Sequence, residues 1–172
     1  MNYLSLMPDD VLEIIYKNIH NDFMKNIKIE IDDELDVRWN RLNDDEKNEY
    51  IDTHYETKYA RFCIYDENEE LIRPESIAFE GFYRFIERII INYDDDDYDF
   101  IEDSDIEYDE ETDEYYILFI SKIMYNPSYV DILLEVDKYI KITGDYDHHF
   151  LEDVYIEGVC DEIGVLKVFL GS

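Results

Sequence analysis

The sequence predicts an α+β domain, in which a helical amino-terminal half packs on a small antiparallel β-sheet formed by the carboxyl-terminal half. Before residue 93, apolar residues recur mostly at steps of three and four, the spacing of helices. After residue 114, apolar runs are continuous or alternate, as in strands. Between them, fourteen of the 21 residues of Asp94–Glu114 are carboxylates. We expect a single domain over 1–172, comprising a mainly helical part at 1–92, an acidic connector and edge strand at 93–114, and strands plus one helix at 115–172.

The composition indicates a folded and strongly acidic protein. Of its 172 residues, 46% are hydrophobic, enough for a core, and the formal net charge is −31. This charge argues against direct binding to nucleic acid or to anionic membranes, because both depend on Lys and Arg. It favours a basic protein as partner instead. The chain shows no signal peptide and no membrane-spanning run, so we expect a soluble, intracellular protein.

The first predicted helix begins near Pro8, whose ring suits the first turn of a helix. Asp9 and Asp10 follow and complement the positive end of the helix dipole. Apolar residues then recur at helical spacing as far as Phe23. Segment 27–31, Ile-Lys-Ile-Glu-Ile, alternates and fits either a short strand or a continuation of the helix.

Two further helices are expected before the acidic stretch. The second begins after Asn43, which is a good cap followed by acidic residues, and apolar residues at i, i+4 steps extend it to Phe62. The third begins at Pro74 and continues to Ile90 with an apolar side. The aromatic residues of this region are interpreted as core.

The carboxyl-terminal half is expected to supply the sheet. The continuous apolar run at 115–120 predicts a buried strand, and the alternation within 101–114 predicts an outer strand and its turn. Ser128 is placed to cap a helix that Gly144 ends in the left-handed conformation. The remaining predicted elements are a helix over 129–140, a strand over 148–157, a turn over 158–164 and a closing strand over 165–171.

The opening segment LSLMPDDVLEIIYKNIH resembles the first helix of the F-box, whose pattern is Leu-Pro-x-Glu/Asp-hydrophobic-Leu-x-x-Ile. Met7 stands where Leu is usual, and Val37-Arg-Trp39 is only a loose counterpart of a later F-box element. The resemblance implies docking on the Skp adaptor of cullin ubiquitin ligases. The alternative is an ordinary amphipathic helix that packs on its own core. The docking residues implied are Leu6, Pro8, Val11, Leu12 and Ile15.

Beyond this segment, the composition and the endings ITGDYDHHFLEDV and VLKVFLGS resemble uncharacterised proteins of giant DNA viruses of the mimivirus and megavirus kind. Ile, Asn, Asp and Tyr are abundant, as AT-rich codons would give. The resemblance implies a viral protein of the host cytoplasm or virus factory. It implies no particular activity.

The acidic stretch has two interpretations. In the first, its carboxylates are solvated and keep an edge strand from pairing with other chains. In the second, carboxylates interleaved with aromatic rings imitate nucleic acid and bind a basic protein. The residues proposed for this contact are Asp94, Asp95, Asp96, Asp97 and Tyr98.

The densest polar cluster outside the acidic stretch contains Asp145, Asp147, His148 and His149, which are weak candidates for a metal site. Asp147-His148-His149 matches the triplet of the DHH phosphoesterases, but the further aspartate motifs of those enzymes are missing, and adjacent histidines of a strand point to opposite faces. No phosphate-binding loop, GxSxG or HExxH motif is present. We therefore expect a non-enzymatic protein-interaction module without a cofactor. An acidic decoy for basic proteins is the alternative, a metal-dependent hydrolase is the weakest hypothesis, and the oligomeric state stays open.

Overall fold

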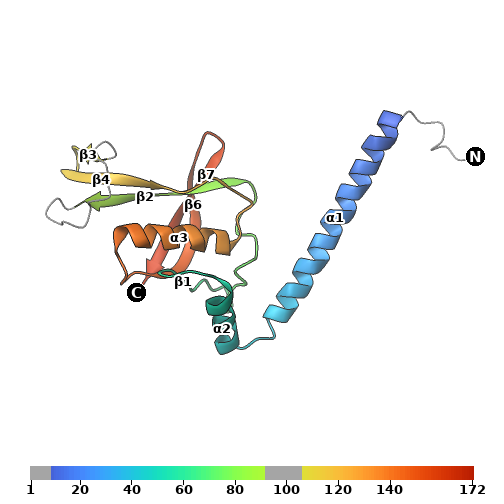
Figure 1. Ribbon diagram of the computed structural model, residues 1–172, viewed down its shortest axis with the longest axis horizontal. Coiled ribbons are helices and arrows are strands. Elements are labelled where there is room, and N and C mark those ends of the chain that lie inside the picture. Colours follow the sequence, from blue (N-terminus) through green and yellow to red (C-terminus); the bar gives the residue numbers. More distant parts are fainter. Residues whose placement is uncertain (1–8, 92–105) are drawn as a thin grey trace, which may run out of the picture. The chain divides into compact units, whose positions relative to one another are not determined.

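The computed structural model describes residues 9–91 and 106–172, with side chains placed for 17–90 and 106–172 (Figure 1). The chain divides into two compact units, 1–43 and 44–172. The first contains helix α1 (Asp9–Trp39), and the second contains the other described helices and the strands. Among the described elements, two helices come before the strands in the chain and a third lies between β5 (Met124–Tyr125) and β6 (Phe150–Cys160). The chain is therefore α+β, as predicted.

Helix α1 is continuous over 31 residues. Segment 27–31, for which the sequence allowed strand or helix, is helical. No Pro or Gly interrupts α1, and apolar residues recur at every fourth position up to Trp39. In the last turn, Arg38 Nε donates to Glu34 Oε1 at 2.9 Å and its charge complements the negative end of the helix dipole.

The second unit is built on a mixed sheet with the strand order β1-β6-β7-β2-β4-β3, in which β5 pairs with β2. Strand β1 is parallel to β6 and β2 is parallel to β7, while the remaining pairs are antiparallel. The expected purely antiparallel sheet is therefore wrong. Both parallel pairs join a segment that was expected to be helical to a carboxyl-terminal strand. The strands are β1 (Arg61–Phe62), β2 (Phe82–Ile91), β3 (Glu107–Asp109), β4 (Glu114–Ile120), β5 (Met124–Tyr125), β6 (Phe150–Cys160) and β7 (Ile163–Gly171).

Strand β2 occupies the place of the expected third helix. Its burial alternates, with Phe85 and Ile89 buried and Phe82 and Ile90 exposed. The β-branched isoleucines of this segment favour a strand. Pairing with β7 on one side and with β4 and β5 on the other outweighs the helical spacing of the same residues.

Helix α2 (Asp44–His54) begins where the sequence predicts, with three acidic residues in its first turn. It ends at His54, so the expected continuation to Phe62 is wrong. Asp137 Oδ1 accepts hydrogen bonds from three successive backbone N–H groups beyond α2, where the chain bends at Lys58 and Tyr59 before Phe62 enters β1. The donors are Lys58 at 2.9 Å, Tyr59 at 2.6 Å and Ala60 at 2.8 Å.

Helix α3 (Tyr129–Thr143) has the predicted caps at both ends. Ser128 Oγ accepts from the Asp131 N–H at 3.3 Å, and the Asp131 carboxylate accepts from the Ser128 N–H at 3.0 Å. Gly144 has φ 66°, and its N–H donates to the Ile140 carbonyl at 2.9 Å. Local signals alone therefore define this helix.

The hairpin of β6 and β7 confirms the two carboxyl-terminal strands but moves their turn. The turn consists of Asp161 and Glu162, with φ of 50° and 67°, in place of the expected 158–164. Positive φ at both central residues is typical of a two-residue hairpin turn whose twist matches the strands.

The core lies between α3 and one face of the sheet (Figure 1). The Phe85 ring of β2 lies 5.4 Å from the Phe119 ring of β4 and 5.4 Å from the Tyr139 ring of α3. Burial raises the pKa of Tyr139 to about 12. The fully buried residues of α3 are Ile132, Leu133, Val136 and Ile140.

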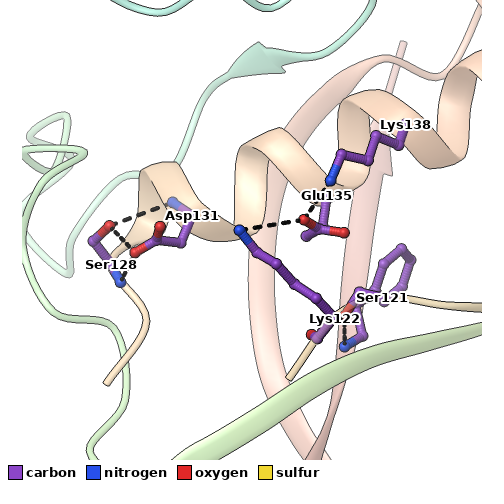
Figure 2. A network of polar contacts seen from close by, with 7 residues as sticks. Ser121, Lys122, Ser128, Asp131, Glu135 and Lys138 are labelled. Atoms are coloured by element: carbon purple, nitrogen blue, oxygen red, sulfur yellow. Dashed lines mark hydrogen bonds and ion pairs between the residues drawn. The ribbon is translucent and has the colours of Figure 1, made fainter. Parts of the chain in front are cut away.

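A buried carboxylate also ties α3 to the segment between β4 and β5 (Figure 2). The Glu135 side chain is 3% exposed, and its Oε1 lies 2.7 Å from Lys138 Nζ and 3.8 Å from Lys122 Nζ. Beside it, Ser121 Oγ accepts from the Phe85 N–H at 2.9 Å. The two lysines neutralise a charge that would otherwise be costly to bury, so we interpret the network as a structural anchor.

Ser128→Ala is expected to lower the free energy of unfolding by about 1 kcal/mol, because the first turn of α3 loses its side-chain acceptor. Urea denaturation followed by circular dichroism measures the loss. Ser172→Ala, at the exposed carboxyl-terminal residue, serves as control and should have no effect. Equal stability of the two variants would contradict the role of the cap.

Candidate interaction surfaces

Helix α1 presents large apolar side chains to solvent. In water such side chains normally lie against a neighbouring element, so a helix that exposes them is a candidate interaction surface. Those at every fourth position from Ile19 to Leu35 form a row, named here the α1 row: Ile19, Phe23, Ile27, Ile31 and Leu35. The exposed fractions of the large apolar side chains of α1 lie between 38% and 64%. These residues are Ile19, Phe23, Met24, Ile29, Ile31, Leu35 and Val37.

The carboxyl-terminal part of the α1 row is hollowed. A shallow depression lies between side chains on the surface of this helix. Apolar side chains form its floor and charged side chains form its rim. This arrangement could accept an apolar side chain of a partner. Its lining residues are Ile27, Glu30, Ile31, Glu34, Leu35 and Arg38.

The predicted docking residues at the amino terminus are only partly described. Leu6 and Pro8 lie outside the described residues, and Val11, Leu12 and Ile15 lie in α1 with side chains that are not described. The α1 row continues the same helix, so the apolar surface extends further than the F-box-like segment. The every-fourth spacing could have shown this extension.

A second apolar surface follows from strand pairing. Phe82 pairs with Tyr125, Ile86 with Ile120, Arg88 with Leu118 and Ile90 with Tyr116. Paired residues share a face of the sheet, as do alternate residues along a strand. Helix α3 packs against the opposite face, through Phe85 and Phe119. The remaining face, named here the open face, contains Phe82, Ile86, Ile90, Leu118, Ile120 and Tyr125.

The open face corrects the prediction that 115–120 is buried. Only Phe119 in this run is buried, because α3 covers one side of the sheet. Five of the six apolar residues of the open face are exposed, by 43% to 67%. A continuous apolar run is typical of a strand that is buried on both faces, so this exposed surface could not be predicted from the sequence. The Phe82 and Tyr125 rings lie 4.9 Å apart upon it.

A polar cluster closes one end of the open face. Arg88 Nη2 lies 2.6 Å from Asp109 Oδ2, and its guanidinium carbon lies 3.7 Å from the centre of the Tyr116 ring. The Tyr116 hydroxyl donates to Glu107 Oε2 at 2.5 Å. The hydrogen bond from Arg88 is the main cause that holds the pKa of Asp109 below its usual value.

The described part of the acidic stretch is an edge hairpin. The sequence predicts an outer strand and its turn within 101–114, and β3, the last strand in the sheet order, lies at 107–109 of this range. The Tyr108 hydroxyl donates to Asp113 Oδ1 at 2.6 Å, and the Tyr108 and Tyr115 rings lie 4.9 Å apart. The predicted contact residues Asp94, Asp95, Asp96, Asp97 and Tyr98 lie outside the described residues.

The residues at 145–149 make ordinary loop contacts. His148 Nδ1 lies 3.1 Å from Asp145 Oδ1, and His149 Nδ1 lies 2.9 Å from the Tyr146 carbonyl oxygen. Within 9–91 and 106–172, no group of three His, Cys, Asp or Glu residues is arranged to hold a metal ion. Asp147 joins no such group, so the geometry gives the metal hypothesis no support.

Comparison with protein-family models, with curated proteins and with solved structures finds no match to the chain. None of the helices in the described part of the chain is both long and apolar enough to span a membrane. The surfaces themselves are therefore the basis for any functional proposal.

Proposed function

We propose that the protein is a non-enzymatic protein-interaction module that docks a partner through the α1 row. The observation that supports the proposal is that four of the five residues of this row are exposed and the fifth, Ile27, is half-buried. Fully burying one large aliphatic or aromatic side chain contributes about 1.5–3 kcal/mol. Several such side chains on one helix therefore represent a large favourable term, which a partner's apolar groove can use.

The expected mode of recognition is a helix in a groove, read by apolar anchors one turn apart. Phe23 is the expected central anchor, because aromatic residues in the middle of an interface contribute most to affinity. The F-box-like segment favours an adaptor of the Skp type as the partner. The α1 row would then lengthen that contact by several helical turns beyond Ile19.

Charge on α1 restricts the partner further. Five carboxylates lie between positions 30 and 36, whereas three lysines lie between positions 17 and 28. A groove with basic residues near the carboxyl-terminal end of α1 and acidic residues near its middle would complement this distribution. The carboxylates are Glu30, Asp32, Asp33, Glu34 and Asp36, and the lysines are Lys17, Lys25 and Lys28.

Binding of the full chain to a purified Skp-type adaptor tests the proposal. Isothermal calorimetry should detect binding that weakens at least about 100-fold in the Phe23→Asp, Ile31→Asp chain, a loss of about 2.8 kcal/mol. The control, Asn18→Asp with Asn21→Asp, adds the same charge to the same helix away from the row and should bind normally. Circular dichroism verifies that both chains keep their helix content.

Two results would contradict these proposals. Absence of adaptor binding by the unaltered chain excludes the F-box-like role. Binding that is equal in the row variant and the control excludes docking through the α1 row.

A second candidate function is an acidic decoy for a basic protein, favoured by the ordered edge hairpin. There, exposed Tyr108 and Tyr115 rings lie among fixed carboxylates, so charge and stacking groups are presented together. Purified histones should bind at low salt and dissociate as salt rises. Replacing Asp94–Asp97 with Asn should abolish that binding. Persistence of binding in that variant would refute a decoy that acts through 94–97.

A further inference from the structure

We propose that the open face is a homodimer interface, which a second copy of the chain covers. This inference is independent of docking through α1. It rests on three properties of the open face, namely its apolar surface, its low negative charge and the placement of its few charged residues.

The apolar surface matches what sheet-on-sheet packing requires. Two sheets pack face to face about 10 Å apart when the inner residues of both are apolar. On the open face, apolar residues from β2, β4 and β5 lie side by side in register, and their exposure reaches 67% at Tyr125. A second open face would cover them with side chains of the same kind.

The charge distribution favours a second copy over a basic partner. Strand β2, which crosses the open face, contributes no carboxylate to it, since its alternate residues there are Phe82, Arg84, Ile86, Arg88 and Ile90. A basic protein would be attracted to the acidic surfaces elsewhere on a chain of net charge −31. The carboxylates of the face, Glu107, Asp109 and Glu114, lie on β3 and β4 at one end of it, so two copies can approach across β2 with little repulsion.

The charged residues of the open face are complementary to themselves under a two-fold axis. Arg84 lies toward one end of the face, and Glu114 of β4, the partner of Asp109 in the sheet register, lies at the other. The Arg84 side chain makes no hydrogen bond or ion pair within the described residues, although its backbone belongs to the β2–β7 pair. We place the two-fold axis between the two packed sheets, so that it runs across the strands and passes near Arg88 and Leu118. This axis brings Arg84 of one copy over Glu114 of the other.

The same axis fits the apolar residues and avoids a charge clash. It places Ile86 of one copy over Ile90 of the second, and Leu118 over its own counterpart. Arg88 lies near the axis, but Asp109 at 2.6 Å already neutralises it. In this arrangement each arginine near the interface therefore has a carboxylate beside it, and no two unneutralised cations face each other.

Sedimentation equilibrium of the full chain tests the interface. Because salt screens repulsion between two strongly negative chains, the dimer should be favoured at about 0.5 M salt and weaken as salt falls. Leu118→Asp should raise the dimer dissociation constant at least 100-fold, equivalent to about 2.8 kcal/mol. Leu134→Asp makes the same change on the outer side of α3, at 37% exposure against 43% for Leu118, and should leave the dimer intact.

A charge exchange tests the two-fold arrangement itself. Arg84→Glu alone and Glu114→Arg alone should each weaken self-association, because both ion pairs of either dimer become like-charged. Mixing the two variants should restore a dimer, since each mixed pair again joins a guanidinium to a carboxylate. Native mass spectrometry resolves the mixed species when one chain is isotope-labelled.

The outcomes separate this proposal from docking through α1. The Phe23→Asp, Ile31→Asp chain should still dimerise. If it does not, the dimer contact involves α1 and the proposal is overturned. A chain that stays monomeric at all concentrations and salts would overturn it too. Equal dimerisation of the Leu118→Asp and Leu134→Asp chains would show that the open face is not the interface.

Discussion

Phe85→Ala is expected to destabilise the second unit by about 4 kcal/mol, the largest effect of any single substitution considered for this chain. Phe85 is fully buried on the covered face of the sheet, where its ring packs against Phe119 and Tyr139. Its removal deletes a large apolar side chain and leaves a cavity at the junction of β2, β4 and α3. Urea denaturation of the full chain measures the change in the free energy of unfolding.

The pKa of Tyr139 gives an independent measure of the same cavity. Burial is the largest cause of the rise to about 12, so admitting water in the Phe85→Ala variant should lower the pKa toward 10. Because the folded pKa is raised, this phenol favours folding below about pH 10, and that contribution is lost as the pH rises toward 12. NMR of labelled tyrosine carbons follows the titration of this one residue.

Phe82→Ala is the matched control for Phe85→Ala. It deletes the same ring from the same strand, but on the open face, where Phe82 is exposed. Compared with Phe85→Ala at low salt and low protein concentration, where the chain is monomeric, it should cost well under half as much stability and leave the Tyr139 pKa unchanged. Similar losses in both variants would contradict the assignment of the two sheet faces.

Local signals decided which elements the sequence could predict. The caps of α3 need only Ser128, Asp131 and Gly144, all within the helix or next to it, and the structure contains each of them. The start of α2 after Asn43 is equally local. The strands β4, β6 and β7 were recognisable because their residues favour strands regardless of partner.

Pairing between distant segments decided the elements that the sequence misassigned. Ile86, Ile89 and Ile90 fit the spacing of a helix and that of a strand equally well. Their strand conformation depends on β4 and β7, and the register with β7 joins Phe85 to Leu166. The mixed sheet follows from the same pairing, because a parallel neighbour cannot be read from either segment alone.

The candidate surfaces were predictable only in part. The apolar spacing of α1 marks a binding or packing face, although the predicted docking residues end at Ile15 and the α1 row continues to Leu35. The open face could not be predicted, because it exists only if β2 is a strand and α3 covers the opposite side. A continuous apolar run such as 115–120 does not reveal which of its residues stay exposed.

Asp137→Ala is expected to lower the free energy of unfolding by about 3 kcal/mol, since one carboxylate oxygen serves three backbone donors. The N–H groups of Lys58, Tyr59 and Ala60 all donate to Oδ1, at distances between 2.6 and 2.9 Å. Alanine at 137 leaves these donors without an acceptor from α3. The segment that leads into β1 then loses its main anchor to the helix.

Hydrogen exchange locates this effect within the unit. Strand β1 is held to the sheet by the Arg61 N–H on the His149 carbonyl and by the Cys63 N–H on the Leu151 carbonyl. These amides should exchange faster in Asp137→Ala, whereas amides in the centre of β2 should change only by the global loss of stability. Asp137→Asn is the matched control, because its amide oxygen still accepts and only the charge is lost. It should cost about 1 kcal/mol. Equal losses in the two variants would mean that the charge of Asp137, and not its position as shared acceptor, holds β1 against the sheet.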